Sequence, residues 1–313
     1  MSGWKIIVTD GLDERGLEIL SEAAKVKLHN SISPEELIEV ISQYDALIVR
    51  GQTRVNGKVF SAATNLKVVG RAGVGVDNID LAAANLNNIT VVNSPAATTQ
   101  AVAEHVLALL FSLARSIPSA NGAMKSGLWH KKQYIGVEIK DKVLGIIGMG
   151  NIGSSVAQMS KSLGMHVIGY DPFISDAEIE RRGAQSVVIQ DLYTQSDFIS
   201  IHVPLSTETR GMIDGGAFGS MKRGVRLICT ARGGIVEETA LLASLESGQV
   251  AGAALDVFAK EPPGMSALVS HPKVIATPHI GAQTAEAQAR AAVDIASEVL
   301  AALDGETLRW KIV

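Results

Sequence analysis

The sequence predicts an α/β protein that is built from parallel sheets and crossover helices. Short apolar segments typical of buried strands alternate with segments of helical periodicity. One apolar segment, residues 143–147, leads into a glycine-rich turn and then into a helical pattern. At 313 residues, with 47% hydrophobic and 19% charged residues, the chain suits a globular protein with two domains of ordinary size.

The first part of the chain contains four strand-like segments with helical patterns between them. Strands are expected at residues 5–9, 46–49, 66–69 and 91–92, and helices at residues 14–24 and from Pro34 onwards. Ser33 followed by Pro34 is typical of a helix start, with a capping hydroxyl and a proline in the first turn. Because strands and helices alternate, this part is expected to form a parallel sheet.

Later segments repeat this alternation. Residues 98–114 form a nearly all-apolar pattern, which predicts a helix that is buried on most faces, between domains or in a subunit interface. Strands are then expected at residues 143–147, 167–170, 198–203, 226–229, 253–257 and 274–276, and a final helix at 284–303. This helix is expected to return the chain to the N-terminal unit.

The glycine-rich turn has the pattern G-x-G-x-x-G. Gly148 allows a tight turn, Gly150 lets the backbone approach a pyrophosphate, and Gly153 lets helix and strand pack closely. The helix N-terminus offers free N–H groups to phosphates. Asp171, at the end of the next strand, suits the hydroxyls of an adenosine ribose and would repel a 2′-phosphate. Since residues 172–175 contain no arginine to neutralise it, the sequence favours NAD over NADP.

Polar clusters follow the later strands, and ligands of open α/β sheets bind beyond such strand ends. His279 suits a general base, and Glu261 would pair with its imidazole and raise its pKa. Arg232 offers a planar fork for a carboxylate. Together they suit hydride transfer between a 2-hydroxy acid and a nicotinamide. Taken alone, a strand-end histidine with a glutamate is more often structural than catalytic, and an arginine in such a turn can simply cap a helix or form a surface ion pair.

Five segments stand in the order found in the D-isomer-specific 2-hydroxyacid dehydrogenases, and the chain resembles this family over essentially its whole length. The segments are residues 70–78, 148–153, 231–236, 254–262 and 278–281. The resemblance implies a Rossmann nucleotide-binding domain, residues 98–285, inserted in a discontinuous, flavodoxin-like substrate-binding domain, residues 1–97 and 286–313. It also implies that the domains close over the substrate.

The resemblance assigns roles to individual residues. Arg232 corresponds to the anchor of the substrate carboxylate, Glu261 to the orienting acid, and His279 to the proton donor and acceptor. The expected cofactor contacts are Gly148, Gly150, Asn151, Ile152 and Gly153 at the turn, Asp171 at the ribose, and Val74, Val203, Thr230, Ala231, Asp256 and Ala282 on the nicotinamide side. The expected substrate contacts are Arg50, Arg71, Val74, Gly75 and Arg232, with Lys131 reaching across a dimer.

The reaction implied is the oxidation of D-3-phosphoglycerate to 3-phosphohydroxypyruvate by NAD, the entry step of serine biosynthesis. Another small 2-hydroxy acid (glycerate or glyoxylate, sulfolactate or an aliphatic keto acid) is an alternative, as is a non-enzymatic NAD-sensing protein similar to a corepressor. Three features depart from the common family pattern, and one of them is the segment of residues 93–99, which differs from common versions. Gly51 replaces a serine that would contact the substrate carboxylate, and Cys229 replaces an asparagine and is expected to be a buried apolar residue.

Composition sets the remaining expectations. The net charge of −4 and the lack of a long basic run argue against nucleic-acid binding, and no apolar run has the length of a membrane span. A single cysteine, with no signal for export, favours the cytoplasm. No histidine spacing suits a metal site. We expect a homodimer through the NAD-binding domain and, since the chain ends at Val313, no C-terminal regulatory domain through which L-serine would inhibit.

Overall fold

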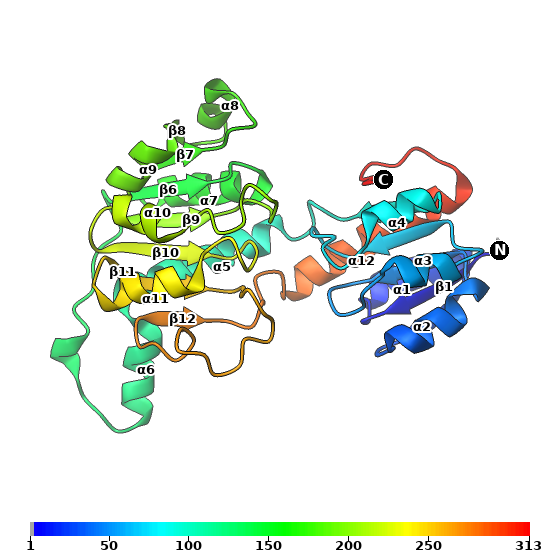
Figure 1. Ribbon diagram of the computed structural model, residues 1–313, viewed down its shortest axis with the longest axis horizontal. Coiled ribbons are helices and arrows are strands. Elements are labelled where there is room, and N and C mark those ends of the chain that lie inside the picture. Colours follow the sequence, from blue (N-terminus) through cyan, green and yellow to red (C-terminus); the bar gives the residue numbers. More distant parts are fainter. Residues whose placement is uncertain (1–2) are drawn as a thin grey trace. The chain divides into compact units, whose positions relative to one another are not determined.

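The computed structural model describes residues 3–313, which divide into two compact units (Figure 1). Unit 1 comprises the described residues up to Thr99 together with Ala282–Val313, and unit 2 comprises Gln100–Gly281. The chain passes from unit 2 back to unit 1 after Gly281, which is before the last helix, whereas the sequence predicted this boundary at residues 285–286. Ile280 and Gly281 belong to unit 2 because their backbone N–H groups donate hydrogen bonds to Asp256.

Unit 1 contains a parallel sheet in the order β2-β1-β3-β4-β5. The strands are β1 (Lys5–Thr9), β2 (Lys25–His29), β3 (Ala46–Val49), β4 (Val68–Arg71) and β5 (Thr90–Asn93). Its helices are α1 (Glu14–Ala23), α2 (Pro34–Val40), α3 (Gly57–Ala62), α4 (Leu81–Leu86) and α12 (Ala285–Asp304), with a 3-10 turn, η1 (Ile41–Gln43). This strand order is the flavodoxin-like one.

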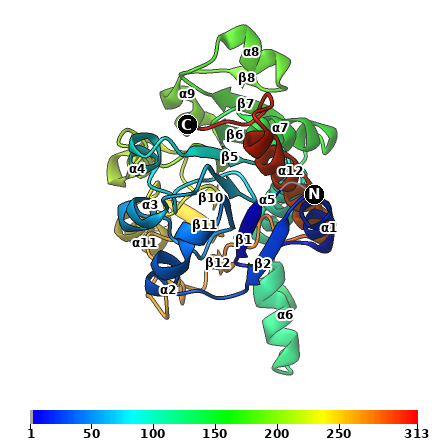
Figure 2. The same ribbon diagram turned by 90° about the vertical axis from the view of Figure 1, so that its right-hand side faces the viewer.

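Side chains alternate between the two faces of this sheet. Ile6 and Val8 of β1 pack in one core with Ile295 of α12, whereas Ile7 packs in the other with Leu37 of α2. Figure 2 accordingly shows α1 and α12 on one side of the strands and α2, α3 and α4 on the other. The helix predicted at Pro34 has a complete capping box with Ser33.

Unit 2 contains a parallel sheet in the order β12-β11-β10-β9-β6-β7-β8. The strands are β6 (Val143–Ile147), β7 (His166–Tyr170), β8 (Gln185–Ser186), β9 (Phe198–Ile201), β10 (Val225–Cys229), β11 (Val250–Leu255) and β12 (Val274–Ala276). The helices are α5 (Thr99–Arg115), α6 (Ile117–Lys125), α7 (Asn151–Ser162), α8 (Asp176–Arg181), α9 (Ile189–Gln195), α10 (Gly215–Ser220) and α11 (Glu238–Glu246), with a 3-10 turn, η2 (Lys131–Gln133).

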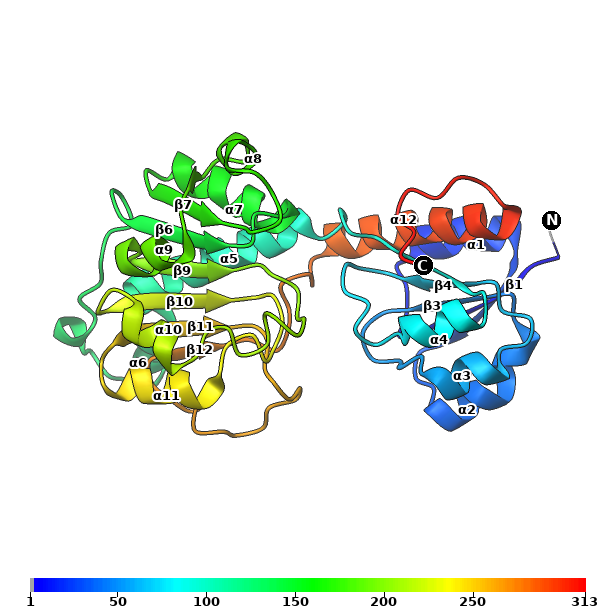
Figure 3. The ribbon, with the colours of Figure 1, turned by 45° about the horizontal axis from the view of Figure 1, so that its top comes forward.

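The sheet of unit 2 has the doubly wound order of a Rossmann domain, with its strand order reversing between β6 and β9. Helices α9, α10 and α11 cover one face, and α5 and α7 cover the other (Figure 3). The predicted fold class, a Rossmann unit inserted in a flavodoxin-like unit, is therefore confirmed. The crevice at the reversal is where ligands bind in such sheets.

Most residues of helix α5 are buried or half-buried, as its apolar pattern predicts. Val106 and Leu110 lie in the core of unit 2, while Phe111 is 41% exposed. Within residues 3–313 no single helix is long and apolar enough to cross a membrane. Helices α5 and α6 pass that test only as a pair, with a 66° bend between them.

Some predicted strand bounds are also shifted. The strand predicted at 198–203 ends at Ile201, and the one predicted at 253–257 spans Val250–Leu255. Val203 and Val257 are apolar but lie in the loops beyond the strands, so hydrophobicity alone overextends the prediction. Strand β2 was not predicted because it is an edge strand whose side chains are exposed or half-buried.

Candidate active site

The three predicted catalytic residues follow three neighbouring strands of unit 2. Arg232 follows β10, Glu261 follows β11, and His279 follows β12. The parallel register pairs Cys229 with Leu255 and Leu255 with Ala276, so the three strands end at the same edge of the sheet. The segments that carry the three side chains therefore leave the sheet side by side.

His279 and Glu261 form a direct pair. His279 Nδ1 lies 2.9 Å from Glu261 Oε2, and the backbone N–H of Phe258 donates to Glu261 Oε1 over 3.0 Å. Burial raises the pKa of Glu261, but the hydrogen bonds from His279 and Phe258 outweigh it and hold this pKa below its ordinary value. An ionised carboxylate can only accept, so Nδ1 carries the proton of the pair and Nε2 remains for proton exchange.

The loop that carries His279 is held by a buried carboxylate. Asp256 is 1% exposed and accepts hydrogen bonds from Thr277 Oγ1 (2.6 Å), Ile280 N (2.9 Å) and Gly281 N (2.8 Å). Burial raises the pKa of Asp256, but the hydrogen bonds from His105, Thr277 and the loop backbone outweigh this effect. The pKa therefore lies below its ordinary value, and the group is ionised.

His279 itself has a positive φ of 53°, a left-handed conformation that is uncommon for residues other than glycine. The hydrogen bonds that the two following residues, Ile280 and Gly281, donate to Asp256 maintain this conformation. His105, on α5, adds a second layer, with Nε2 3.3 Å from Thr277 Oγ1 and 3.5 Å from Asp256 Oδ1. No local pattern in the sequence indicates that His105 supports this loop.

The turn that carries Arg232 packs tightly against the segment that carries Glu261. A Cβ atom at Gly233 would lie 1.8 Å from the carbonyl oxygen of Phe258, so only glycine permits this approach. Glu238, which no sequence motif singles out, accepts a hydrogen bond from Ala259 N over 2.7 Å. Arg232 Nη1 donates to the carbonyl of Ala231 over 2.6 Å.

The glycine-rich turn is shaped by close backbone packing. A Cβ atom at Gly148 would lie 2.8 Å from the backbone of His202 and 2.9 Å from Val203, and one at Gly153 would lie 2.1 Å from the Gly148 oxygen. At Gly150 nothing lies within 4 Å of such an atom. Gly150 also caps α7 without a side chain, so the first N–H groups of the helix, beginning at Asn151 and Ile152, face the open side.

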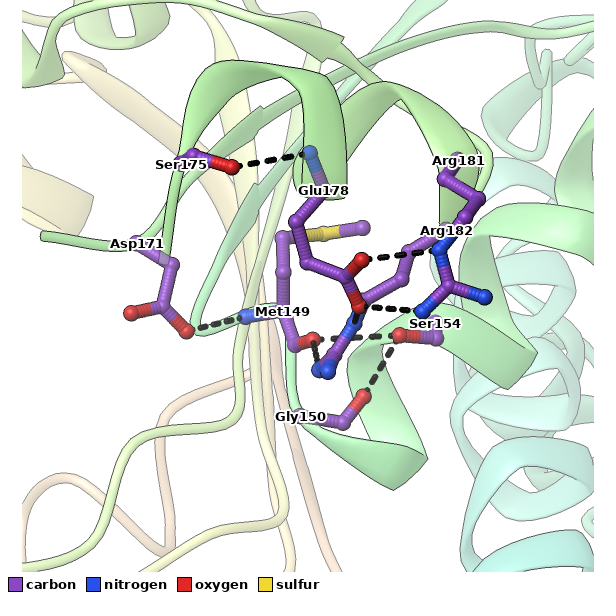
Figure 4. Close-up of polar contacts among 8 residues, drawn as sticks. All are labelled: Met149, Gly150, Ser154, Asp171, Ser175, Glu178, Arg181 and Arg182. Atoms are coloured by element: carbon purple, nitrogen blue, oxygen red, sulfur yellow. Dashed lines mark hydrogen bonds and ion pairs between the residues drawn. The ribbon is translucent and has the colours of Figure 1, made fainter. Parts of the chain in front are cut away.

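Asp171 lies directly against this turn. Its Oδ2 accepts from Met149 N over 2.9 Å (Figure 4). Its Oδ1 accepts from Phe173 N over 3.0 Å. Each carboxylate oxygen keeps further acceptor capacity, which ribose hydroxyls can use.

Within residues 3–313, Thr230 Oγ1 at the end of β10 is buried without a hydrogen-bond partner. The turn, the acid and this orphaned hydroxyl fit a dinucleotide.

His202 follows β9, and its backbone packs against Gly148 of the turn. It is in contact with Ser200, whose Oγ lies 2.8 Å from His202 Nε2. Burial lowers the pKa of His202 to about 4, so its imidazole is neutral at physiological pH.

The predicted basic residues Arg50 and Arg71 lie at the carboxyl ends of β3 and β4, which are neighbours in the sheet of unit 1. The backbone N–H of Arg50 donates to Asp10 Oδ2 over 3.0 Å, and Thr53 Oγ1 donates to Asp10 Oδ1 over 2.6 Å. Burial lowers the pKa of Arg50, while the charge of Asp10 opposes this effect. Asp10 itself has a φ of 65°, a left-handed conformation.

The other predicted positions of unit 1 lie in its loops. Asn93 Nδ2 donates to the carbonyl of Val74 over 2.7 Å and thereby holds the segment that leads to Gly75. Ala282 lies at the start of the returning chain, and its carbonyl accepts from Gln288. A Cβ atom at Gly51 would meet nothing within 4 Å, so the missing serine leaves open space.

Lys131 is not brought to the carboxyl edge of its own unit. It lies on η2, in the segment that connects α6 to β6, and that segment is bound to the end of α5 through Val137 N and the Ala114 carbonyl (2.9 Å). The chain then enters β6 from its amino end.

Comparison with known proteins identifies the relatives of this chain. Residues 107–281 match the family described as "D-isomer specific 2-hydroxyacid dehydrogenase, NAD binding domain". The D-3-phosphoglycerate dehydrogenase of Synechocystis sp. is 45% identical over 94% of this chain and 53% of its own length. That of Archaeoglobus fulgidus is 42% identical over 97% of this chain and 58% of its own length. The chain thus spans about half the length of these curated relatives.

A solved structure is similar over the full chain. The crystal structure of a glyoxylate reductase from Paecilomyes thermophila superposes with a TM-score of 0.91 at 30% identity, over 100% of this chain and 99% of the other. The matched domain is an NAD-binding domain, which confirms the cofactor predicted from the turn and Asp171.

Cys229 gives a testable prediction, because the residue is 1% exposed and burial raises the pKa of its thiol to about 11. The thiolate is the reactive species, so the native protein should not react with a thiol reagent at about pH 8. After unfolding in denaturant, one thiol should react rapidly. Stoichiometric labelling of the native protein would show that Cys229 is accessible.

Proposed function

This chain belongs to the family of D-isomer-specific 2-hydroxyacid dehydrogenases, and from that membership we propose that it oxidises D-3-phosphoglycerate to 3-phosphohydroxypyruvate with NAD. The observation that carries the proposal is the His279–Glu261 pair, positioned beside the Arg232 turn at the carboxyl edge of an NAD-binding sheet. The similarity of the whole chain to D-3-phosphoglycerate dehydrogenases supports the choice of substrate.

We assign each catalytic side chain one step. Arg232 binds the substrate carboxylate through its planar guanidinium and thereby orients the 2-hydroxyl group. His279 takes the hydroxyl proton at Nε2 as the carbonyl forms, and it returns a proton there in the reverse direction. Glu261 stabilises the imidazolium that results, through the hydrogen bond at Nδ1. NAD, when bound, accepts the hydride at its nicotinamide ring.

We assign the NAD contacts to the turn and to its surroundings. The N–H groups of Asn151 and Ile152 bind the pyrophosphate, and Asp171 binds the ribose hydroxyls. Thr230, Ala231, Asp256 and Val203 at the strand ends, with Val74 and Ala282 from unit 1, are assigned to the nicotinamide side.

The basic residues of unit 1 supply selectivity for a phosphorylated substrate. We propose that Arg50 and Arg71 bind the substrate phosphate, with backbone contacts from Val74 and Gly75. Both arginines come from ends of adjacent strands, and Asp10 holds the backbone of Arg50 in place. Lys131 is proposed to act on the site of a partner subunit.

A substrate panel tests the proposed activity. Initial rates with NAD for D-3-phosphoglycerate and D-glycerate, and with NADH for the corresponding keto acids and glyoxylate, compare acids with and without phosphate. We expect kcat/KM to be roughly a hundredfold higher for D-3-phosphoglycerate than for D-glycerate, because the guanidinium contacts are lost with the phosphate. Better turnover of glyoxylate would place the activity with the glyoxylate reductases instead.

Substitution of His279 tests the proton-transfer step. His279→Ala should lower kcat by about 10²–10⁴-fold, because the general acid and base is removed, while the Kd for NADH changes little. His166→Ala, at an exposed histidine that begins β7, is the matched control and should leave both quantities unchanged. An unaltered kcat in His279→Ala would remove His279 from the mechanism.

We further propose a homodimer through unit 2. Several large apolar side chains are exposed on the end of α5, on α6 and on the segment that follows: Phe111, Ile117, Met124, Leu128, Trp129 and Ile135. Figures 1 and 2 show α6 projecting from the rest of unit 2. An apolar patch of this kind marks an interface, and a second copy would bury it.

Charge inserted into this patch tests the dimer. Trp129 is 77% exposed, and Trp129→Glu should shift the sedimentation coefficient from that of a dimer to that of a monomer. Met265→Glu changes an apolar residue outside the patch that is 88% exposed, and this variant should remain dimeric. A monomeric parent chain, or a dimer that survives Trp129→Glu, would contradict this interface.

We also propose that the reaction belongs to serine biosynthesis and takes place in the cytoplasm. The product, a phosphorylated 2-keto acid, suits the first step of serine biosynthesis. The only cysteine, Cys229, is a buried free thiol, which is consistent with a reducing cytoplasm.

A further inference from the structure

A carboxylate and two arginines lie next to the glycine-rich turn. Glu178, in α8, binds Arg181 through Nη2 (2.7 Å) and Nε (2.8 Å), and it binds Arg182 Nε over 2.5 Å (Figure 4). The two arginines follow Glu178 by three and four residues, a spacing that places all three side chains on the same face of the helix. Ser175 caps α8 by accepting a hydrogen bond from Glu178 N over 3.3 Å.

The two arginines differ in what else they contact. Arg182 Nη1 donates to the backbone carbonyl of Met149 over 2.6 Å, whereas the side chain of Arg181 is 74% exposed. Met149 is the residue between the first two glycines of the turn. Its N–H is already bound to Asp171, so both of its backbone polar groups have charged partners from outside the turn.

The Met149 carbonyl matters because it shares a peptide plane with the N–H of Gly150. In a trans peptide these two groups point in opposite directions. Rotation of this plane changes ψ of Met149 and φ of Gly150, and because glycine lacks the Cβ that restricts φ, Gly150 would let the plane turn. A turned plane would aim a carbonyl oxygen, rather than an N–H group, at the phosphate oxygens. Arg182 and Ser154, whose Oγ lies 3.1 Å from the same carbonyl, oppose that rotation.

We propose that Arg182, oriented by Glu178, is a positioning residue of the NAD site, which fixes the Met149–Gly150 peptide so that the Gly150 N–H faces the pyrophosphate. The inference rests on NAD binding by the turn. It concerns the affinity for the dinucleotide and not the hydride or proton transfer, because Arg182 is bound to the turn and to α8 and not to the catalytic residues.

The test compares two arginines that share one carboxylate. In fluorescence titrations of the full chain with NADH, Arg182→Gln should raise the Kd roughly five- to tenfold, the order expected when a charged hydrogen bond is lost at a half-exposed site. Arg181→Gln removes the same charge from the same ion pair without touching the turn, so its Kd should stay within about twofold of that of the parent chain.

Two further variants separate the anchor from general electrostatics. Arg182→Lys keeps the charge but has one nitrogen where arginine uses two, so it should give an intermediate Kd; it also serves if Arg182→Gln does not fold. Glu178→Gln should raise the Kd as well, and the double variant Glu178→Gln/Arg182→Gln should be no weaker than Arg182→Gln alone, because the pair acts as one unit. The two arginines lower the pKa of Glu178 to about 2, so its carboxylate is ionised at neutral pH.

Kinetics distinguish positioning of the turn from general damage. Arg182→Gln should raise the KM for NAD in proportion to the Kd and leave kcat within about twofold. Equal Kd values for Arg182→Gln and Arg181→Gln, or a fall in kcat without a change in Kd, would overturn the inference. Failure of the parent chain to bind NADH would instead refute the NAD-dependent function itself.

Discussion

The hydrogen-bonded register of β10, β11 and β12 is the constraint on which the candidate active site depends. Cys229, Leu255 and Ala276 are register partners, so the next residues of all three strands emerge at one edge of the sheet. Side chains alternate between faces along a strand, and a slip of one residue would turn the apolar core residues outward. The large apolar cores on both faces of this sheet therefore also determine where the catalytic loops begin.

A buried carboxylate converts this common edge into a defined geometry. Asp256 follows β11 directly and binds the loop that follows β12, so two segments that end side by side become one structure. Burying a charge is costly unless it is fully hydrogen-bonded, and here the N–H and O–H donors are all present. The arrangement leaves His279 in a left-handed conformation with its Nδ1 at Glu261. Rigid support of this kind suits a group that must exchange protons repeatedly at one position.

The cofactor side of the sheet relies on the absence of side chains. Gly148, Gly153 and Gly233 each allow a backbone contact that a Cβ atom would prevent. Charged side chains from neighbouring elements hold the glycine-rich turn in place by hydrogen-bonding to its backbone. Asp171 binds the turn at Met149 N, and Arg182 binds it at the Met149 carbonyl. In unit 1, Asp10 binds the backbone of Arg50 and Thr53 in a similar way. Acidic and basic residues thus shape loops in both units, besides the roles proposed for them toward ligands.

The sequence alone indicated the alternation of strands and helices and the glycine-rich turn, because hydrophobic periodicity and the conformational needs of glycine are local properties. Its resemblance to the dehydrogenase family implied the inserted-domain fold class and the roles of Arg232, Glu261 and His279. Only the tertiary structure decided which groups support them. His105, Glu238 and Arg182 contact residues that are distant in the sequence, and no local pattern distinguishes them from ordinary surface or core residues. The edge strand β2 was missed for a related reason, because pairing with β1, rather than its own hydrophobicity, makes it a strand.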